Sequence, residues 1–226
     1  MFDDFSLVQR LDVIRALCAG KKVLHLGCVN SPYTNESMEA ATLLHADLGR
    51  IAGELWGLDS DIDGIEILNS LGWSNIVHGD LENLNDVDLP NDFEVIIAGE
   101  VIEHLSNPGL FLDGIRRFMN PQTLLVITTV NAYCAMRFFW YAARGKGGRV
   151  EFVHPDHVAY YSFSTLRVLI ERSGLSIEQF LFYDVGNEHR PHNRWFLNLL
   201  NDISVYFARN CADGLVAICR LRNEEK

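Results

Sequence analysis

The sequence predicts an α/β fold, in which a doubly wound, Rossmann-like and mostly parallel sheet of seven strands carries helices on both faces. Short apolar runs of strand length alternate with segments of helical spacing along most of the chain. A glycine or an acidic residue follows each of the first four runs, as expected where strands end in loops. With 226 residues, 48% of them hydrophobic, the chain can bury one core, so we expect a single domain over residues 1–226.

The individual elements follow from these patterns in chain order. Apolar, often β-branched runs predict strands at residues 22–26, 54–58, 75–78, 93–98, 123–129, 177–183 and 215–221. Apolar residues at helical spacing predict helices at residues 4–19, 37–53, 62–71, 108–119 and 164–173. Glycine follows three of these helices, at Gly20, Gly72 and Gly174, in the position where glycine commonly ends a helix.

Two aromatic-rich segments interrupt the simple alternation. Residues 131–153 follow the fifth strand and end in a glycine-rich stretch, and residues 186–221 hold a further helical pattern before the last strand. We expect a helical insertion after strand 5 and a C-terminal helix. These helices either complete the core or form a lid over a substrate, with glycines as the hinge.

Composition excludes several classes of protein. The net charge is −11 and no block of Lys or Arg occurs, so binding to a nucleic-acid backbone is not expected. No apolar run approaches the ~18 residues of a membrane span, and the acidic N-terminus does not resemble a signal peptide. The five cysteines form no C-x-x-C pair, which indicates reduced thiols and a cytoplasmic protein. The sequence does not indicate the oligomeric state.

The residues after the first three strands suit a nucleotide-like ligand. Gly27 lets the backbone approach a ligand closely. Asp59 is placed to accept hydrogen bonds from ribose hydroxyls, and Asp80 adds a second acid at the same edge. Both acids could instead be helix caps or turn residues. A nicotinamide-dependent oxidoreductase is a weaker alternative, because the chain has no G-x-G-x-x-G motif at this turn.

A second group of polar residues follows the fourth strand. Glu100, Glu103 and His104 are spaced i, i+3 and i+4, so we expect them on one face of a helix that begins there. Two carboxylates and an imidazole at the end of a parallel strand indicate a site for chemistry.

Taken in order, these strand ends resemble a known family. The segments Val23–Cys28, Gly57–Asp59, Gly79–Glu82 and Ala98–Leu105 resemble the class I S-adenosylmethionine-dependent methyltransferases. The similarity is greatest to the branch of ubiquinone-biosynthesis O-methyltransferases and related bacterial small-molecule methyltransferases. It implies methyl transfer to a small molecule, most often at oxygen, and an antiparallel last strand.

The resemblance also implies the residues that bind S-adenosylmethionine. These are His25, Gly27, Cys28, Asp59, Asp80, Leu81, Gly99 and Glu100. Asp59 would hold the ribose, Asp80 and Leu81 the adenine, and Glu100 would lie beside the sulfonium. His25 replaces the usual acid and Val29 the usual second glycine, which raises the alternative of a non-catalytic binding or regulatory module.

Some relatives carry a Glu-x-x-Glu-His metal site that is completed by a later histidine from an Asp-His pair. The resemblance therefore implies that Mg²⁺, Mn²⁺ or Zn²⁺ is held by Glu100, Glu103, His104 and His157. Two alternatives stay open: Glu103 and His104 act as catalytic acid and base without a metal, or the group is structural. The aromatic segments suggest an apolar or lipid-linked acceptor.

Overall fold

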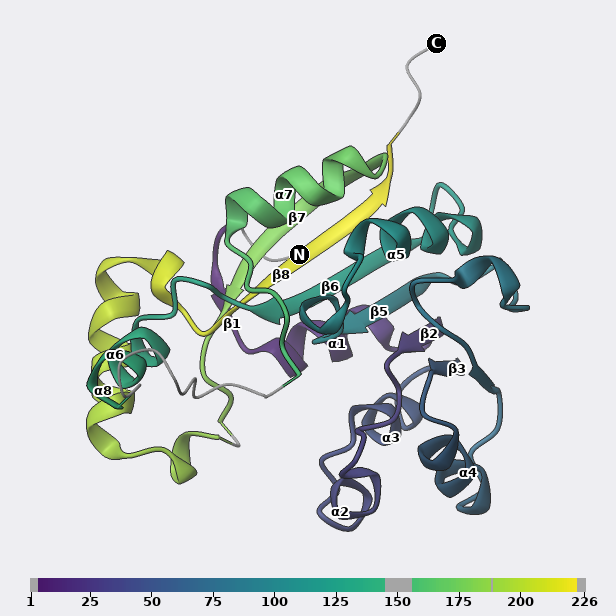
Figure 1. The fold of residues 1–226 in the computed structure, drawn as a ribbon, viewed down its shortest axis with the longest axis horizontal. Coiled ribbons are helices and arrows are strands. Elements are labelled where there is room, and N and C mark those ends of the chain that lie inside the picture. The colour runs from purple at the N-terminus through teal and green to yellow at the C-terminus, as the bar shows by residue number, and fades with distance from the viewer. Residues whose placement is uncertain (1–3, 145–155, 188, 223–226) are drawn as a thin grey trace.

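The computed structural model describes residues 4–144, 156–187 and 189–222 (Figure 1). Eight strands form one sheet in the order β1-β7-β8-β6-β5-β2-β3-β4. Their bounds are β1 Leu7–Val8, β2 Lys22–Leu26, β3 Glu54–Asp59, β4 Ile76–His78, β5 Val95–Gly99, β6 Leu124–Val130, β7 Leu175–Tyr183 and β8 Gly214–Leu221. All pairs are parallel except those that β8 makes with β6 and β7. The expected fold class and the antiparallel last strand are confirmed.

Helices connect these strands along most of the chain. The α-helices are α1 Arg10–Cys18, α2 Thr34–Glu39, α3 Leu44–Gly49, α4 Ile62–Ser70, α5 Pro108–Ile115, α6 Ala135–Arg144, α7 Phe163–Arg172 and α8 Trp195–Phe207. Short 3₁₀ turns are η1 Leu84–Asp86, η2 Ile102–His104, η3 Arg116–Phe118, η4 Arg190–His192 and η5 Arg209–Cys211. No helix among the described residues is both long and apolar enough to span a bilayer.

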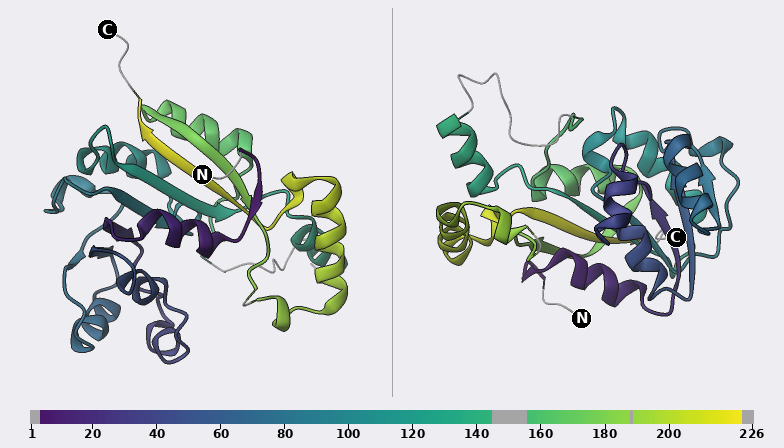
Figure 2. Two further views of the ribbon diagram at one scale, coloured as in Figure 1. Left: turned by 180° about the vertical axis from the view of Figure 1, so that it is seen from behind. Right: turned by 90° about the horizontal axis from the view of Figure 1, so that it is seen from below.

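The sheet is buried on both faces because successive side chains of its strands point to opposite sides. On β5, Val95 and Ile97 belong to the cluster that contains α1 and α3, whereas Ile96 and Ala98 belong to the cluster that contains α5 and α7. Figure 2 shows α1 on one side of the sheet and α5 and α7 on the other. This two-sided packing explains why the central strands are continuous apolar runs.

Two of the expected helices are wrong in extent. Residues 4–19 do not form one helix, because Leu7 and Val8 pair with Phe182 and Tyr183 of β7 before α1 begins at Arg10. This pairing adds the eighth strand. The helix expected at residues 37–53 is replaced by two short helices, the first of which begins earlier, at Thr34, since the chain turns at Ala41 with a φ of +55° between α2 and α3.

The expected helical insertion follows β6, the fifth strand of the prediction. There α6 packs against α8, and the pair stands at one end of the sheet (left in Figure 1). The predicted glycine hinge falls on residues 145–153, outside the described residues. The lid interpretation therefore stays a prediction.

Candidate active site

The carboxyl ends of four parallel strands meet along one edge of the sheet. Leu26 of β2 pairs with Leu58 of β3 on one side and with Ala98 of β5 on the other. Asp59 pairs with His78, so β4 continues the same edge. The loops that follow these strands lie side by side, in the position where open α/β sheets bind ligands.

Gly27 turns the chain at the end of β2. Its φ is +65°, and its N–H donates a hydrogen bond to the Leu58 carbonyl with an N···O distance of 2.9 Å. A Cβ atom on Gly27 would lie 2.7 Å from a side-chain methyl of Val101. Both conformation and space therefore require glycine, which leaves the backbone of the turn bare for a ligand.

The side chains of the next two residues point into the core. Cys28 is fully buried, and burial raises the pKa of its thiol, so it is a neutral packing residue. Val29 is buried in a cluster with Ile65 and Leu68 of α4. A Cβ on Gly64 would overlap the Val29 side chain, so glycine in α4 makes room for it. The branched side chain of Val29 thus packs beneath the turn.

Asp59 is oriented by backbone donors. Its Oδ2 accepts from the Val29 N–H at 2.8 Å, and its Oδ1 accepts from the Asp61 N–H at 3.0 Å. Burial raises the pKa of Asp59, and these N–H groups oppose that rise. Each carboxylate oxygen can accept two hydrogen bonds, so both can still accept from a ribose hydroxyl.

Asp80 and Leu81 follow β4 on the same edge. Asp80 is exposed, and its Oδ1 accepts from the Glu82 N–H at 2.8 Å. Leu81 is buried in the core. Glu82 ties this loop to the start of α5 by accepting from the Ser106 N–H and from the Asn107 amide. A bare turn, an oriented carboxylate and an exposed acid form a donor and acceptor set that fits a nucleoside.

His25 lies against a second histidine. Its Nδ1 is 3.3 Å from the Nδ1 of His45 on α3, and the two rings are stacked with centroids 5.5 Å apart. Burial lowers the pKa of His25 well below its usual value, and His45 and Arg10 lower it further. His25 is therefore a neutral residue, and it does not replace the negative charge of an acid.

Glu100 has a left-handed backbone conformation, with a φ of +58°. The Tyr183 hydroxyl donates to its Oε1 at 2.5 Å, and a nitrogen of Arg10 lies 3.9 Å from its Oε2. Desolvation raises the pKa of Glu100, but the charge of Arg10 and the Tyr183 hydrogen bond outweigh it and hold the pKa below its usual value. A carboxylate is thereby kept ionised directly after β5 and Gly99.

The expected single helix face is wrong. Residues 102–104 form the 3₁₀ turn η2, and the left-handed Glu100 lies before it. Instead, Glu103, His104 and His157 each offer a ligand atom within 4.8 Å of one another. Glu100 is not part of this group. Three of the four expected ligands thus lie together among the residues that the structure describes, and the metal site itself stays a prediction.

Backbone hydrogen bonds bring His157 to this group. The Val158 and Ala159 N–H groups both donate to the Glu103 carbonyl, at 2.9 and 3.2 Å. The rings of His104 and His157 then meet edge to face, with centroids 4.6 Å apart. The pairing of an Asp-His segment with the Glu-x-x-Glu-His segment thus has a structural basis.

Glu103 is the most perturbed acid of the site. It is fully buried, and within the described part of the chain neither carboxyl oxygen has a hydrogen-bond partner. Burial, with the nearby charge of Glu100, raises its pKa to about 8, and weak contacts with the Thr129 side chain and the Val130 backbone only partly oppose that rise. A buried carboxyl without a partner is costly, so such a group usually serves a ligand or a reaction. The group of three fits a divalent cation, since carboxylate and imidazole are ordinary metal ligands.

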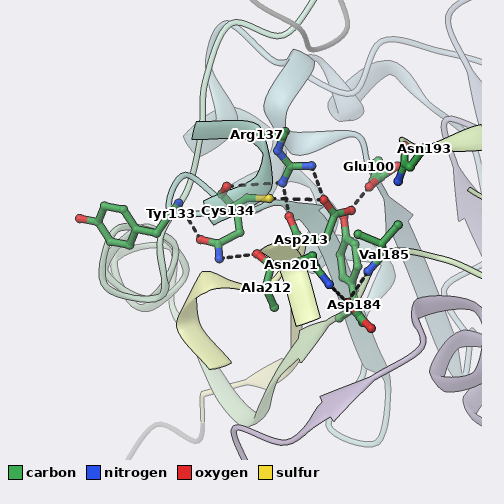
Figure 3. A network of polar contacts seen from close by, with 12 residues as sticks. Glu100, Tyr133, Cys134, Arg137, Asp184, Val185, Asn193, Asn201, Ala212 and Asp213 are labelled. Atoms are coloured by element: carbon green, nitrogen blue, oxygen red, sulfur yellow. Dashed lines mark hydrogen bonds and ion pairs between the residues drawn. The ribbon is translucent and has the colours of Figure 1, made fainter. Parts of the chain in front are cut away.

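A polar network joins the two extra helices to this edge (Figure 3). Arg137 of α6 donates to Asp213, immediately before β8, at 2.7 Å. Asn201 of α8 donates to Asp184, immediately after β7, at 2.7 Å. The helix pair is thus fixed to the strand ends that also position Tyr183.

Sequence reasoning missed Arg10 and Tyr183. Arg10 belongs to a segment that reads as an ordinary amphipathic helix, and nothing in its pattern indicates a contact with Glu100, 90 residues later. Tyr183 is the last residue of a predicted strand, and this position could have indicated that it belongs to the site.

Comparisons with known proteins agree with this geometry. A family model described as a methyltransferase domain matches residues 10–179. The chain belongs to this methyltransferase family. A crystal structure of a SAM dependent methyltransferase from Archaeoglobus fulgidus has the same fold, with a TM-score of 0.57 at 16% sequence identity over 93% of this chain and 94% of that one. The fold is thus that of the S-adenosylmethionine-dependent methyltransferases.

Curated relatives of this chain include two proteins named ubiquinone biosynthesis O-methyltransferase, each 24% identical to it. The protein from Bradyrhizobium diazoefficiens matches over 182 residues, which are 71% of this chain and 64% of the relative. The protein from Nitrobacter winogradskyi matches over 205 residues, 82% of this chain and 67% of the relative. The chain spans about two thirds of the length of these relatives, so their names support its family and leave its acceptor to be determined.

Proposed function

We propose that this methyltransferase transfers a methyl group from S-adenosylmethionine to a hydroxyl oxygen of a small-molecule acceptor. The observation that carries the proposal is the buried Glu103 beside His104 and His157, on the same sheet edge as the Gly27 turn and Asp59. Oxygen as the acceptor atom is supported by the names of the curated relatives. The aromatic helices α6 and α8 near this edge favour an apolar, including a lipid-linked, acceptor.

The cofactor, when bound, supplies an electrophilic methyl group on a positively charged sulfur. In the proposed site, the bare turn at Gly27 passes along its methionine part, Asp59 accepts from the ribose hydroxyls, and Asp80 and Leu81 flank the adenine. Glu100 provides a negative charge near the sulfonium, which favours binding of the cation. His25 and Cys28 support the turn from the core side.

The acceptor must be aligned and its hydroxyl made more nucleophilic. We propose that Glu103, His104 and His157 hold one divalent cation, which would lower the pKa of a hydroxyl bound to it. Glu100 is not among the proposed ligands, because Arg10 and Tyr183 engage its carboxylate. The metal-free alternative uses His104 as the base that accepts the hydroxyl proton.

Calorimetric titration of Zn²⁺, Mn²⁺ and Mg²⁺ at pH 8 separates these two possibilities. We expect wild type to bind at least one of these ions, Glu103→Gln to lose that binding, and the surface variant Glu94→Gln to keep it. Because Glu103 must lose its proton to bind a cation, affinity should fall on going to pH 6.5. If wild type binds none of the three ions, the metal proposal is wrong and His104 remains as the base.

Transfer itself is tested with radiolabelled S-adenosylmethionine and a panel of phenolic, catecholic and long-chain quinol acceptors. We expect labelled O-methyl products and their loss in Glu103→Gln and His104→Ala. Cofactor binding without transfer to any hydroxyl, but with transfer to nitrogen or sulfur acceptors, would contradict the choice of oxygen.

A further inference from the structure

The helix α8 exposes an apolar face to solvent. Its inner side is buried through Leu197, Asn201 and Val205. On the opposite side five apolar residues are between 50% and 84% exposed. This outer face of α8 consists of Trp195, Leu199, Ile203, Tyr206 and Phe207.

These residues lie on one side of the helix. Trp195, Leu199 and Ile203 are spaced by four positions, and Tyr206 follows three positions later, so they share a stripe that runs the length of α8. The neighbouring helix α6 adds exposed Phe138 and Phe139. An isolated exposed apolar side chain needs no explanation, but a continuous apolar stripe on a helix marks a contact surface.

The outer face is held in place by polar contacts on the other side of the helix. The amide of Asn198 donates to the Arg190 carbonyl at 2.9 Å, and the amide of Asn201 donates to Asp184 at 2.7 Å. The α6 ring of Trp140 lies 6.4 Å from Phe196 of α8. In both orientations of Figure 2, α8 lies at the periphery of the molecule, so its outer face is presented outward by a fixed support.

The charges around this face are positive, although the whole chain carries −11. Arg194 directly precedes α8, Arg209 follows it by two residues, and both are exposed. Arg144 at the end of α6 and Arg194 both lie over the Trp140 ring, at 4.8 and 5.3 Å. Asp202, the acidic residue of α8, accepts from Arg190 at 2.7 and 3.2 Å, and Arg190 also donates to Asp184 at 2.7 Å, so the positive excess comes from the other three arginines.

We propose that the outer face of α8 docks this protein on an anionic lipid bilayer, with the helix lying flat in the headgroup region. Tryptophan and tyrosine prefer that region. In a helix that lies flat, both ends reach the lipid phosphates, and an arginine is present at each end of α8. With 13 residues α8 is about 20 Å long, too short to cross the apolar layer of about 30 Å.

A second copy of the chain fits this face less well. A stripe about 20 Å long and 10 Å wide offers about 200 Å², whereas a stable dimer buries about 800 Å² on each partner. The rest of the molecule is strongly acidic, so two copies repel each other. The basic helix pair α6 and α8 is the part of the molecule that a negatively charged surface attracts.

Sedimentation with lipid vesicles tests this docking without cofactor or acceptor, so it is independent of methyl transfer. We expect the wild type to sediment with vesicles of phosphatidylcholine and 30% phosphatidylglycerol, and less with phosphatidylcholine alone. A triple variant, Trp195→Ser, Tyr206→Ser and Phe207→Ser, should lose at least tenfold in partitioning. Arg194→Gln with Arg209→Gln should lose severalfold and abolish the preference for anionic lipid.

Leu71→Ser with Leu110→Ser is the matched control, since both leucines are 55% exposed, Leu71 directly after α4 and Leu110 on α5, distant in sequence from α8. It should bind vesicles like the wild type. All the variants change exposed residues, and circular dichroism checks that each is folded. No binding of wild type to either vesicle, or equal binding by the triple variant, would overturn the proposal. Dimeric wild type that becomes monomeric in the triple variant, seen by ultracentrifugation, would assign the face to a second copy instead.

Discussion

Gly27 and Gly20 both have a positive φ, but their surroundings differ. At Gly20 an added Cβ would meet nothing within 4 Å, whereas at Gly27 it would lie 2.7 Å from Val101. Both alanine variants carry the conformational strain of about 1–2 kcal/mol, and Gly27→Ala adds a clash of about 1–3 kcal/mol. We predict that Gly27→Ala is the less stable variant and loses S-adenosylhomocysteine binding at least tenfold, measured by urea unfolding and calorimetry. Equal behaviour of the two variants would mean that the turn tolerates a side chain.

Tyr183 keeps Glu100 ionised through a hydrogen bond of 2.5 Å. Removal of the hydroxyl in Tyr183→Phe should raise the pKa of Glu100, because the ionised form loses a donor. Glu100 supports cofactor binding in its ionised form, which is present above its pKa. On acidification, Tyr183→Phe should therefore lose cofactor binding at a higher pH than the wild type does. Calorimetry with S-adenosylhomocysteine between pH 4 and 7 measures the shift. Tyr206→Phe, at an exposed position, should leave the profile unchanged, and an unchanged profile in Tyr183→Phe would show that this hydroxyl does not act on Glu100.

Glu103 should make the protein less stable as the pH rises towards 8. Its pKa is about 8 in the folded state against a usual value of 4.5, so the folded protein keeps a proton that the unfolded chain releases. The protonated carboxyl stabilises the folded state fully at a pH below its pKa in the unfolded chain. This stabilisation is lost as the pH rises through its pKa in the folded protein. Between the two pKa values the free energy of unfolding falls by about 1.4 kcal/mol per pH unit. The pKa values of His25 and His45 are lowered, so protonation of these two histidines affects the free energy of unfolding only at lower pH.

Urea unfolding between pH 6.5 and 8 isolates the effect of Glu103. We predict that stability falls over this range in wild type and in Glu94→Gln, and that the fall is absent in Glu103→Gln. The measurement is made with a chelator, because a bound cation would stabilise the ionised carboxylate. The same fall in Glu103→Gln would assign it to another group.

At the scale of elements, Gly214 decides how β8 lies beside β7. A Cβ on Gly214 would overlap the ring of Tyr183, with which it pairs across the two strands. We predict that Gly214→Ala costs about 3 kcal/mol, since neither ring nor strand can move without loss of packing. Gly109→Ala, where nothing lies within 4 Å, should be close to neutral. Urea unfolding measures both, and a neutral Gly214→Ala would show that the ring can leave its place.

The strands were predictable because their signals are local. Runs such as residues 93–98 and 123–129 are mainly apolar and stop at glycine or polar residues, so the type and order of the strands follow from the sequence. The two-residue strand β1 was not predictable, because it exists only through pairing with β7. The break between α2 and α3 was missed for a similar reason. The turn at Ala41 is held by hydrogen bonds from the Thr42 and Leu43 N–H groups to the Ser37 carbonyl, which the helical spacing does not encode.

The candidate site was predictable as far as strand ends determine it. Gly27, Asp59 and Asp80 lie on one edge because parallel strands end together. The helix face of Glu100, Glu103 and His104 was wrong, because a left-handed residue directly after β5 changes the direction of every following side chain. The approach of His157 to Glu103 depends on backbone hydrogen bonds between distant segments, and it entered the prediction through family resemblance alone.

At the scale of the molecule, the sheet has two halves. From β2 the chain proceeds outward through β3 and β4, and from β5 it proceeds outward in the other direction through β6. Glu100 and Glu103 follow β5 and so lie at the point where the direction changes, which is where such sheets bind ligands. The proposed cofactor residues other than Gly99 and Glu100 lie on the β2–β4 side, and the helix pair α6 and α8 lies on the other. This division leaves the reacting groups between a cofactor half and an acceptor half.

The central claim is that this edge binds S-adenosylmethionine with Asp59 on the ribose. The most direct measurement is calorimetric titration of S-adenosylmethionine and S-adenosylhomocysteine into wild type, Asp59→Ala and Asp63→Ala, which changes an acid in the first turn of α4 instead. We predict micromolar binding by wild type and Asp63→Ala and none by Asp59→Ala. If folded wild-type protein binds neither compound, the chain is a binding module that keeps the fold without the cofactor, and the proposed methyl transfer is wrong.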